Sequence, residues 1–336
     1  MRLLMVKLSA FGDIIHCLPA LEDALAAGCE VHWLLDRRYR FVRALFPSCV
    51  VVHEVDLKGK RSLRATMRCV HRLRRLGFAR IVDVQGLMKS ALLARAIGGE
   101  VMGMDARYVR ERPAAMLQKG ARFDDRERHV VQQYRKVVHV ALTGDAARVM
   151  PYAPPRVRDE VRARFRPLDE ARALAAQLGR YVLLHVGGGW ATKRLPDKTW
   201  LALAEGLTEL GVTPVFAWGN EAEQRLAGAL ASRSDGRCLP RRFDLSSLAH
   251  LLAHARAVVG ADTGVLHLAA ALDRPTVTFW GPSASWRSGP QGKGHRHVES
   301  HPRCGPCFKR TCDHFTCMDE IRASAILEAL HESGAV

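Results

Sequence analysis

The sequence lacks an apolar stretch long enough to cross a membrane. A transmembrane helix needs about 20 predominantly apolar residues in succession, and no run in these 336 residues approaches that length. The first eight residues carry one arginine ahead of a short apolar run that Lys7 interrupts, which is not the pattern of a secretory signal. We therefore expect a soluble protein located in the cytoplasm.

Two common glycine motifs of nucleotide-binding domains are also missing. The chain contains neither the G-x-G-x-x-G of dinucleotide-binding domains nor the Gly-Lys-Ser/Thr of P-loops. The sequence therefore supports neither a nicotinamide cofactor nor a P-loop nucleotide. A disulfide framework is equally unsupported, because the nine cysteines are odd in number and five lie scattered in apolar or mixed surroundings. Such cysteines are typical of reduced thiols in a reducing compartment.

Acidic residues are scarce relative to basic ones. The chain has 34 Asp and Glu against 51 Lys and Arg, a formal net charge of +17. The partners should therefore be anionic: nucleic acid, a phosphorylated substrate or an acidic membrane surface. A nucleic-acid-binding protein would show aromatic residues interleaved with the cations and a recognised binding module, and neither is present. We expect no nucleic-acid partner.

Short apolar strands alternate with helical segments along most of the chain. This alternation predicts parallel sheets covered by helices, and the length suits two domains of roughly 150 residues. Pro151, Pro154 and Pro155 interrupt the pattern. We predict an amino-terminal domain at 1–155, a carboxyl-terminal domain at 156–320, and a last helix in 321–336 that packs back on the first domain.

The most informative stretch is 258–272, which predicts a buried strand, a tight turn at Asp262-Thr263-Gly264 and a helix. The first N–H groups of that helix and its dipole favour an anion, and Gly264 allows close approach of a phosphate. Thr263 could cap the helix or bind phosphate, Asp262 could anchor the turn or bind a sugar hydroxyl, and His267 could donate to phosphate. Such turns also occur for purely structural reasons.

Two further strand ends in the second half carry candidate ligands. Gly187, Gly188 and Gly189 follow a strand, with Thr192 and Lys193 close behind, a pattern that can wrap an anion beside a cation. Glu223 follows the next strand. A carboxylate at that position commonly binds ribose hydroxyls, although an acid in the first turn of a helix is also favoured by the dipole.

The first half offers a carboxylate and a basic run. Asp13 follows the first strand, where it could cap a helix or act as a general base toward a hydroxyl group. The basic run lies at 58–75. Its cations either line a solvated helix face or bind phosphates and carboxylates. They are Lys58, Lys60, Arg61, Arg64, Arg68, Arg72, Arg74 and Arg75.

Four of the cysteines form a cluster near the end of the chain. Cys304, Cys307, Cys312 and Cys317 have the spacing C-x2-C-x4-C-x4-C. Four thiols this close in an otherwise reduced protein favour a structural zinc or iron. The alternative is a set of loop cysteines that bind no metal. Neither interpretation makes the cluster catalytic.

Three segments resemble the ADP-heptose:lipopolysaccharide heptosyltransferases, glycosyltransferase family 9. They are 7–13 (KLSAFGD), 83–90 (DVQGLMKS) and 262–272 (DTGVLHLAAAL). The resemblance implies the GT-B fold, two Rossmann-like α/β domains whose parallel sheets face each other across a cleft. The middle segment, with Gly103-Met104-Asp105, looks more like heptosyltransferase I than heptosyltransferase II.

The resemblance also implies roles for individual residues. It makes Asp13 the catalytic base and Lys193 the cation on the donor phosphates. It implies donor contacts for Gly188, Gly189, Thr192, Trp218, Glu223, Asp262, Thr263, Gly264 and His267. It implies acceptor contacts for Ser9, Gly12, Lys58, Lys60, Arg61, Arg64 and Gln85.

The implied reaction is an inverting transfer of heptose from ADP-heptose to the Kdo of Kdo2-lipid A, with no catalytic metal or cofactor. It would take place at the cytosolic face of the bacterial inner membrane, with peripheral contact to the acidic leaflet. Heptosyltransferase II and the enzymes that heptosylate autotransporter proteins stay open as alternatives, because cysteine clusters similar to this one occur among them. A nucleotide-binding protein without catalysis is the alternative from another class.

Overall fold

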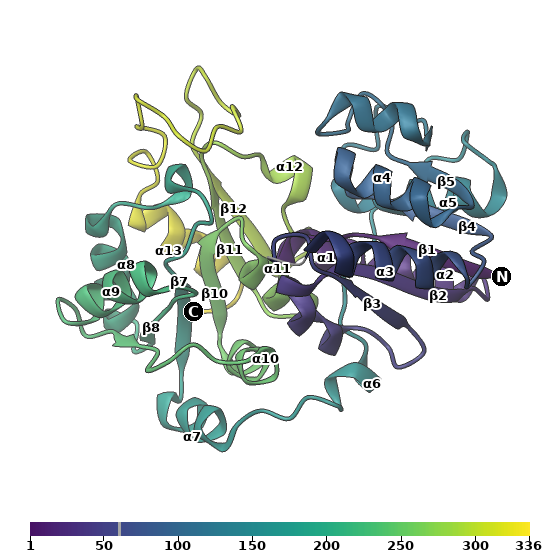
Figure 1. Cartoon of the computed structure of the whole chain (residues 1–336). Coiled ribbons are helices and arrows are strands. Elements are labelled where there is room, and N and C mark those ends of the chain that lie inside the picture. Colours follow the sequence, from purple (N-terminus) through teal and green to yellow (C-terminus); the bar gives the residue numbers. More distant parts are fainter. Residues whose placement is uncertain (60–61) are drawn as a thin grey trace. The chain divides into compact units, whose positions relative to one another are not determined.

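Two α/β units make up the chain, Met1–Ala163 and Arg164–Val336, in a computed structural model that describes residues 1–59 and 62–336. Each unit contains one six-stranded sheet in which all the strand pairs are parallel (Figure 1). The prediction of two α/β domains with parallel sheets is confirmed. That the sheets face a common cleft stays a prediction.

The first sheet has the strand order β3-β2-β1-β4-β5-β6. The elements of this unit are β1 (Arg2–Val6), α1 (Phe11–His16), α2 (Leu18–Ala26), β2 (Glu30–Asp36), the 3-10 helix η1 (Arg37–Leu45), β3 (Val51–Val55), α3 (Ser62–Arg74), β4 (Arg80–Asp83), α4 (Met88–Ile97), β5 (Glu100–Gly103), η2 (Arg112–Leu117), β6 (Lys119–Gly120), α5 (Val130–Thr143) and α6 (Asp159–Arg162).

The second sheet has the strand order β12-β11-β10-β7-β8-β9. The elements of this unit are α7 (Asp169–Leu178), β7 (Tyr181–His185), η3 (Ala191–Lys193), α8 (Asp197–Glu209), β8 (Thr213–Ala217), α9 (Glu221–Ala231), β9 (Arg237–Cys238), α10 (Leu245–His254), β10 (Ala257–Ala261), α11 (Gly264–Ala271), β11 (Thr276–Trp280), α12 (Ser285–Ser288), β12 (His295–Glu299) and α13 (Ala323–Glu332).

The central strands of both sheets are mostly apolar because helices cover both faces. Nearly every residue of β1, β7 and β10 is buried, as expected for parallel strands. In each sheet the chain starts near the middle and the strand order reverses there, between β1 and β4 in the first sheet and between β7 and β10 in the second. Ligands of open α/β sheets bind outside the carboxyl ends of the strands at such a reversal.

Two boundary predictions differ from the structure. The first unit extends past residue 155 through α6, because Arg158 bonds Glu22 at 2.8 Å and Val161 is fully buried. The last helix, α13, packs on α8, β11 and β12 of the second unit (Figure 1), where Ile326 and Leu330 join the apolar core. The prediction that the last helix packs back on the first domain is therefore wrong, because α13 packs within the second unit.

A fully buried ion pair stabilises the end of the first unit. Lys136 of α5 lies 3.6 Å from Glu127, and both side chains have no exposed surface. The same glutamate accepts the backbone N–H groups of Asp124 and Met150 at 2.7 Å each, and the Lys136 ammonium also donates to the Arg148 carbonyl. Through these bonds, the Glu127 carboxylate joins the loop that precedes α5 to the loop that follows it.

We expect Lys136→Met to lower the free energy of unfolding of the first unit by about 3 to 5 kcal/mol, because it leaves the Glu127 charge buried without its cation. Urea denaturation followed by circular dichroism measures the loss. Lys119→Met, which removes an exposed lysine of the same unit, serves as the control and should change stability by less than about 1 kcal/mol. Equal stability of the two variants would contradict the expectation.

Candidate functional site

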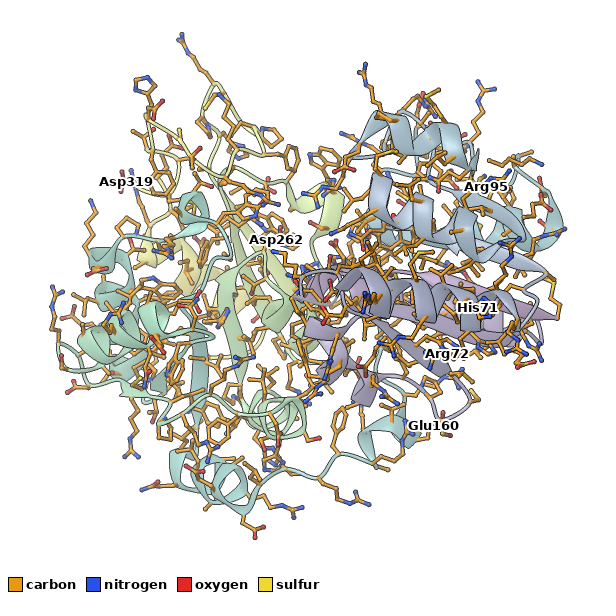
Figure 2. All side chains as sticks on the ribbon, viewed as in Figure 1. His71, Arg72, Arg95, Glu160, Asp262 and Asp319 are labelled. Carbon is orange, nitrogen blue, oxygen red and sulfur yellow. The ribbon has the colours of Figure 1, made fainter. Side chains whose placement is uncertain are left out.

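Asp262 links two segments of the second unit at the reversal of strand order. It directly follows β10, and Figure 2 labels it. One carboxylate oxygen accepts a hydrogen bond from Lys193 Nζ at 2.6 Å, and the other lies 2.9 Å from His267 Nε2. Lys193 comes from the loop after β7 and His267 from the second turn of α11. The Asp262 carboxylate therefore holds the Lys193 ammonium and the His267 imidazole close together.

The ionisation of Asp262 is set by these two partners. Burial alone would raise the pKa of this carboxyl, but the hydrogen bond from His267 and the charge of Lys193 hold its pKa far below the ordinary value. Asp262 is thus ionised at neutral pH. A phosphate would have to compete with Asp262 for the predicted hydrogen bond from His267, because His267 Nε2 already faces that carboxylate.

Lys193 keeps part of its donor capacity for a ligand. Its ammonium donates to the Asp262 carboxylate at 2.6 Å and to the Asp262 backbone carbonyl at 3.1 Å. An ammonium has three N–H donors, so these contacts leave one for a further acceptor. The ammonium also lies 4.4 Å from the centroid of the Trp190 ring. Lys193 is buried, which strengthens any charge interaction that it makes.

The start of α11 presents unpaired donors beside this cation. Thr263 precedes the helix, and its side chain makes no capping bond. Its buried hydroxyl oxygen has no hydrogen-bond partner among the described residues, and neither has Nδ1 of the buried His185 at the end of β7. Buried polar atoms without partners are uncommon in folded proteins. Together with the N–H groups that the first turn of a helix leaves without intrahelical partners, they indicate a binding site for an anion.

The glycine-rich loop after β7 is shaped by close approach of other groups. A side chain on Gly187 would begin 2.7 Å from the Glu223 carboxylate, and one on Gly188 would begin 3.1 Å from Cβ of Lys193. Gly189 has a φ of 67°, in the left-handed region that glycine adopts without strain. Glycine at these positions lets the backbone pass between the glutamate and the lysine.

Glu223 lies between the loops after β7 and β8. Its carboxylate accepts the backbone N–H of Gly219 at 2.8 Å, and its own N–H is capped by Asn220. Glu223 is buried, so it is more than a solvated first-turn acid. Trp218, just ahead of it, donates from Nε1 to the Leu239 carbonyl at 2.9 Å. A ribose contact for Glu223 and a donor contact for Trp218 stay predictions.

In the first unit, Asp13 lies at the reversal of strand order, in the first turn of α1. Its carboxylate accepts the backbone N–H of Ala10 at 3.3 Å, so it helps to cap the helix from inside the first turn. Ser9, Gly12 and Asp13 are all partly exposed. Lys7 is buried nearby and bonds Tyr134 Oη at 3.0 Å. Burial alone would lower the pKa of Lys7, but the charges of Tyr134 and Asp13 raise its pKa.

Gln85 supports the loop that carries Asp13. Its side-chain oxygen accepts the backbone N–H groups of Leu8 and Ser9 at 2.9 and 3.0 Å, and the residue is buried. Asp83 accepts the N–H of Gln85 and the hydroxyl of Ser90. The side-chain carbonyl of Gln85 therefore holds the loop in place. The predicted contact of Gln85 with the acceptor substrate stays a prediction.

A cavity of about 430 Å³ lies beside the predicted acceptor loop. It is lined by Arg37, Arg43, Val52, Glu54, Asp56, Ala65 and Arg72. Arg37 and Arg43 were missed by the sequence analysis, although the cation-rich segment after a predicted strand was a signal for them. Lys58, which follows β3, and Arg64, in the first turn of α3, are exposed. Lys60 and Arg61 lie outside the described residues.

The outer face of α3 combines cations with exposed apolar side chains. Leu63 is 75% exposed and Met67 is 60% exposed. Arg68, His71 and Arg75 are exposed on the same helix or at its end, and Figure 2 labels His71. Met67, Arg68, His71, Arg72, Arg75 and Leu76 line a shallow depression of about 600 Å³. Within residues 1–59 and 62–336, no helix is both long and apolar enough to cross a membrane.

The metal-ligand role of the four cysteines near the end of the chain stays a prediction. They are free thiols, and no group of three or more His, Cys, Asp or Glu among the described residues is arranged to hold a metal ion. They lie in one neighbourhood. Burial and the charges of the other three thiolates therefore raise the pKa of Cys317. The predicted zinc or iron gains no support from this arrangement.

The family model of glycosyltransferase family 9 (heptosyltransferase) matches residues 66–317. Lipopolysaccharide heptosyltransferase 1 of Pseudomonas aeruginosa is 34% identical over 322 residues, which cover 93% of this chain and 87% of that protein. Lipopolysaccharide heptosyltransferase 2 of Salmonella typhimurium is 36% identical over 97 residues only, 27% of this chain and 28% of that protein. The structure of Escherichia coli heptosyltransferase WaaC with ADP covers 99% of this chain and 100% of its own, with a TM-score of 0.78 at 25% identity.

We expect the second unit to lose stability in acid through Asp262. The folded pKa of this carboxyl lies below its unfolded value of about 3.9, so its contribution is fully present above that pH and is lost as the pH falls below it. Asp262→Asn should therefore melt lower than the parent protein at pH 7, and the gap should narrow between about pH 4 and pH 2. Calorimetry across this range measures the gap. For Asp169→Asn, at a fully exposed position, we expect almost no gap. A gap for Asp262→Asn that does not change with pH would contradict the expectation.

Proposed function

Because this chain belongs to glycosyltransferase family 9, the heptosyltransferases, we propose that it transfers a heptose from ADP-heptose to a Kdo residue of the lipopolysaccharide inner core. The observation that carries the proposal is the ion-paired cluster of Asp262, Lys193 and His267 at the start of α11. A heptosyltransferase 1 relative that aligns with nearly the whole chain favours the first heptose transfer over the second.

The second unit supplies the donor site. Lys193 and the N–H groups at the start of α11 would bind the diphosphate, with the unpaired Thr263 hydroxyl as a further donor. Glu223, buried between two strand ends, would bind the ribose hydroxyls. The match to a heptosyltransferase structure that contains ADP supports an adenine nucleotide as a ligand of this chain.

The first unit supplies the base. Asp13 would remove the proton from the acceptor hydroxyl, whose oxygen then attacks the anomeric carbon of the heptose while the bond to the ADP oxygen breaks. This single displacement inverts the anomeric configuration. The negative charge that develops on ADP is stabilised by Lys193 and by the dipole of α11. Positive protein groups thus provide the charge compensation in this scheme.

The acceptor would bind the cationic side of the first unit. Kdo2-lipid A carries carboxylates and phosphates, which arginine binds in bidentate fashion. Arg37, Arg43 and Arg72 line the cavity there, with Lys58 and Arg64 exposed next to it. Glu54 in the same lining pairs with Arg43 at 3.1 Å, and Asp56 accepts the backbone N–H groups of Lys58 and Gly59.

Asp13→Asn tests the proposal. We expect it to reduce heptose transfer about 10² to 10⁴-fold, because the amide cannot accept the proton, while the affinity for ADP stays unchanged. Mass spectrometry of the lipid product and calorimetric titration with ADP measure the two quantities. A parent protein that binds ADP without transferring heptose would overturn the enzymatic proposal and leave a nucleotide-binding protein.

The acceptor can be separated in the same assay. The parent protein is supplied with ADP-heptose and one of three acceptors: Kdo2-lipid A, the same lipid already carrying one heptose, or an autotransporter passenger protein. The proposal requires product from the first acceptor. Product only from the second or the third would replace it with one of the alternative heptosyltransferase activities.

We also propose that α3 rests on the acidic inner leaflet, where the lipid acceptor lies. Basic helices with exposed apolar side chains bind such surfaces, and Leu63 and Met67 are the exposed apolar residues here. Each arginine near an anionic surface contributes about 1 kcal/mol. The proposal places the protein at the cytosolic face of the membrane.

Arg68→Glu combined with Arg75→Glu should weaken binding to vesicles of anionic phospholipid by roughly tenfold or more, since two attractive charges become repulsive. Vesicle sedimentation at low and high salt measures the binding, which should also fall with salt. Arg225→Glu, an exposed charge reversal on α9 of the second unit, is the matched control. Binding insensitive to both salt and the α3 variant would contradict the proposal.

A further inference from the structure

The segment that contains the four cysteines, residues 304–317, contacts the glycine-rich donor loop through two neighbouring residues. The Thr192 hydroxyl donates a hydrogen bond to the Lys309 backbone carbonyl at 2.8 Å. The guanidinium carbon of Arg310 lies 5.4 Å from the centroid of the Trp190 ring. Thr192 directly precedes Lys193 and Trp190 lies three residues before it, so both contacts fall close to the cation of the proposed donor site.

The same segment is braced on the loop that follows β11. The N–H of Phe308 donates to the Pro282 carbonyl at 2.7 Å, and the Arg287 guanidinium lies 5.7 Å from the Phe308 ring. At the other end of the segment, Cys317 and Met318 fill the space where a side chain on Gly281 would begin. Residues 308–310 therefore connect a strand end of the sheet to the donor loop.

Two cations approach the same indole ring. Lys193 Nζ lies 4.4 Å and the Arg310 guanidinium carbon 5.4 Å from the centroid of Trp190. A cation near an aromatic face is attracted by its quadrupole, so both charged groups help to fix the position of the ring. The position of Trp190 in turn limits where the Lys193 ammonium can lie while it bonds Asp262.

We infer that Arg310 is a positioning residue of the donor site. It holds the Trp190 ring and, through that ring, keeps the Lys193 ammonium where the donor diphosphate binds. The Thr192 bond to the Lys309 carbonyl is the second tether of the same loop. The identity of the ligand rests on the proposed function, whereas the tethers do not depend on it.

Calorimetric titration with ADP tests this role without requiring transfer. We expect Arg310→Ala to raise the Kd for ADP about two- to fivefold, the range for an exposed cation and an aromatic ring, and Arg310→Lys to restore part of the affinity. In transfer assays the KM for the donor should rise while the KM for the acceptor stays unchanged. Arg303→Ala removes another exposed cation, directly before this segment, and should leave the Kd unchanged.

A double variant separates positioning from direct contact with the ligand. If Arg310 acts through the ring, Arg310→Ala should add almost nothing to the loss caused by Trp190→Leu. Additive losses would mean that the guanidinium touches the diphosphate itself, and would overturn the positioning role. An unchanged Kd in Arg310→Ala, with an unchanged melting temperature, would overturn it as well. Normal ADP binding by the parent protein without heptose transfer would instead remove the proposed function and leave this inference standing.

Discussion

The ionised carboxylate of Asp262 is the contact on which the second unit's site depends. It brings Lys193 from the loop after β7 and His267 from α11 to the carboxyl end of β10. Without this anion, the Lys193 ammonium would lose the carboxylate that holds it beside the start of α11. The cost of burying the aspartate is offset by both partners, and the ammonium keeps a donor for the ligand.

The parallel sheet explains why such a cluster forms there. β7 and β10 are neighbours, and the connections leave them in opposite directions along the sheet. The loops after these strands therefore separate and expose a space into which their side chains project. The first sheet repeats this arrangement between β1 and β4, and Asp13 and Gln85 follow those strands. One topological rule thus places the candidate base and the candidate donor site on their respective units.

Charge is distributed according to these roles. The first unit carries the arginine-lined cavity and the cationic outer face of α3, which suit an acceptor rich in phosphates and carboxylates. In the second unit, Lys193 and His267 both pair with the carboxylate of Asp262. Family 9 membership, established by the family match and by the relatives, agrees with this division between a sugar-nucleotide site and an acidic acceptor.

The sequence by itself determined what depends on local spacing: the strand, turn and helix at 258–272, the glycine-rich loop before Lys193, and the parallel α/β class with its family. Only the tertiary structure decided which of these residues meet. Asp262 was interpreted as a turn anchor or a sugar ligand, yet it pairs with Lys193, 69 residues away. Thr192 bonds Lys309, 117 residues away, and α13 packs in the second unit. Periodicity reveals which face of an element is apolar, but strand order decides which loops become neighbours, and no local pattern encodes it.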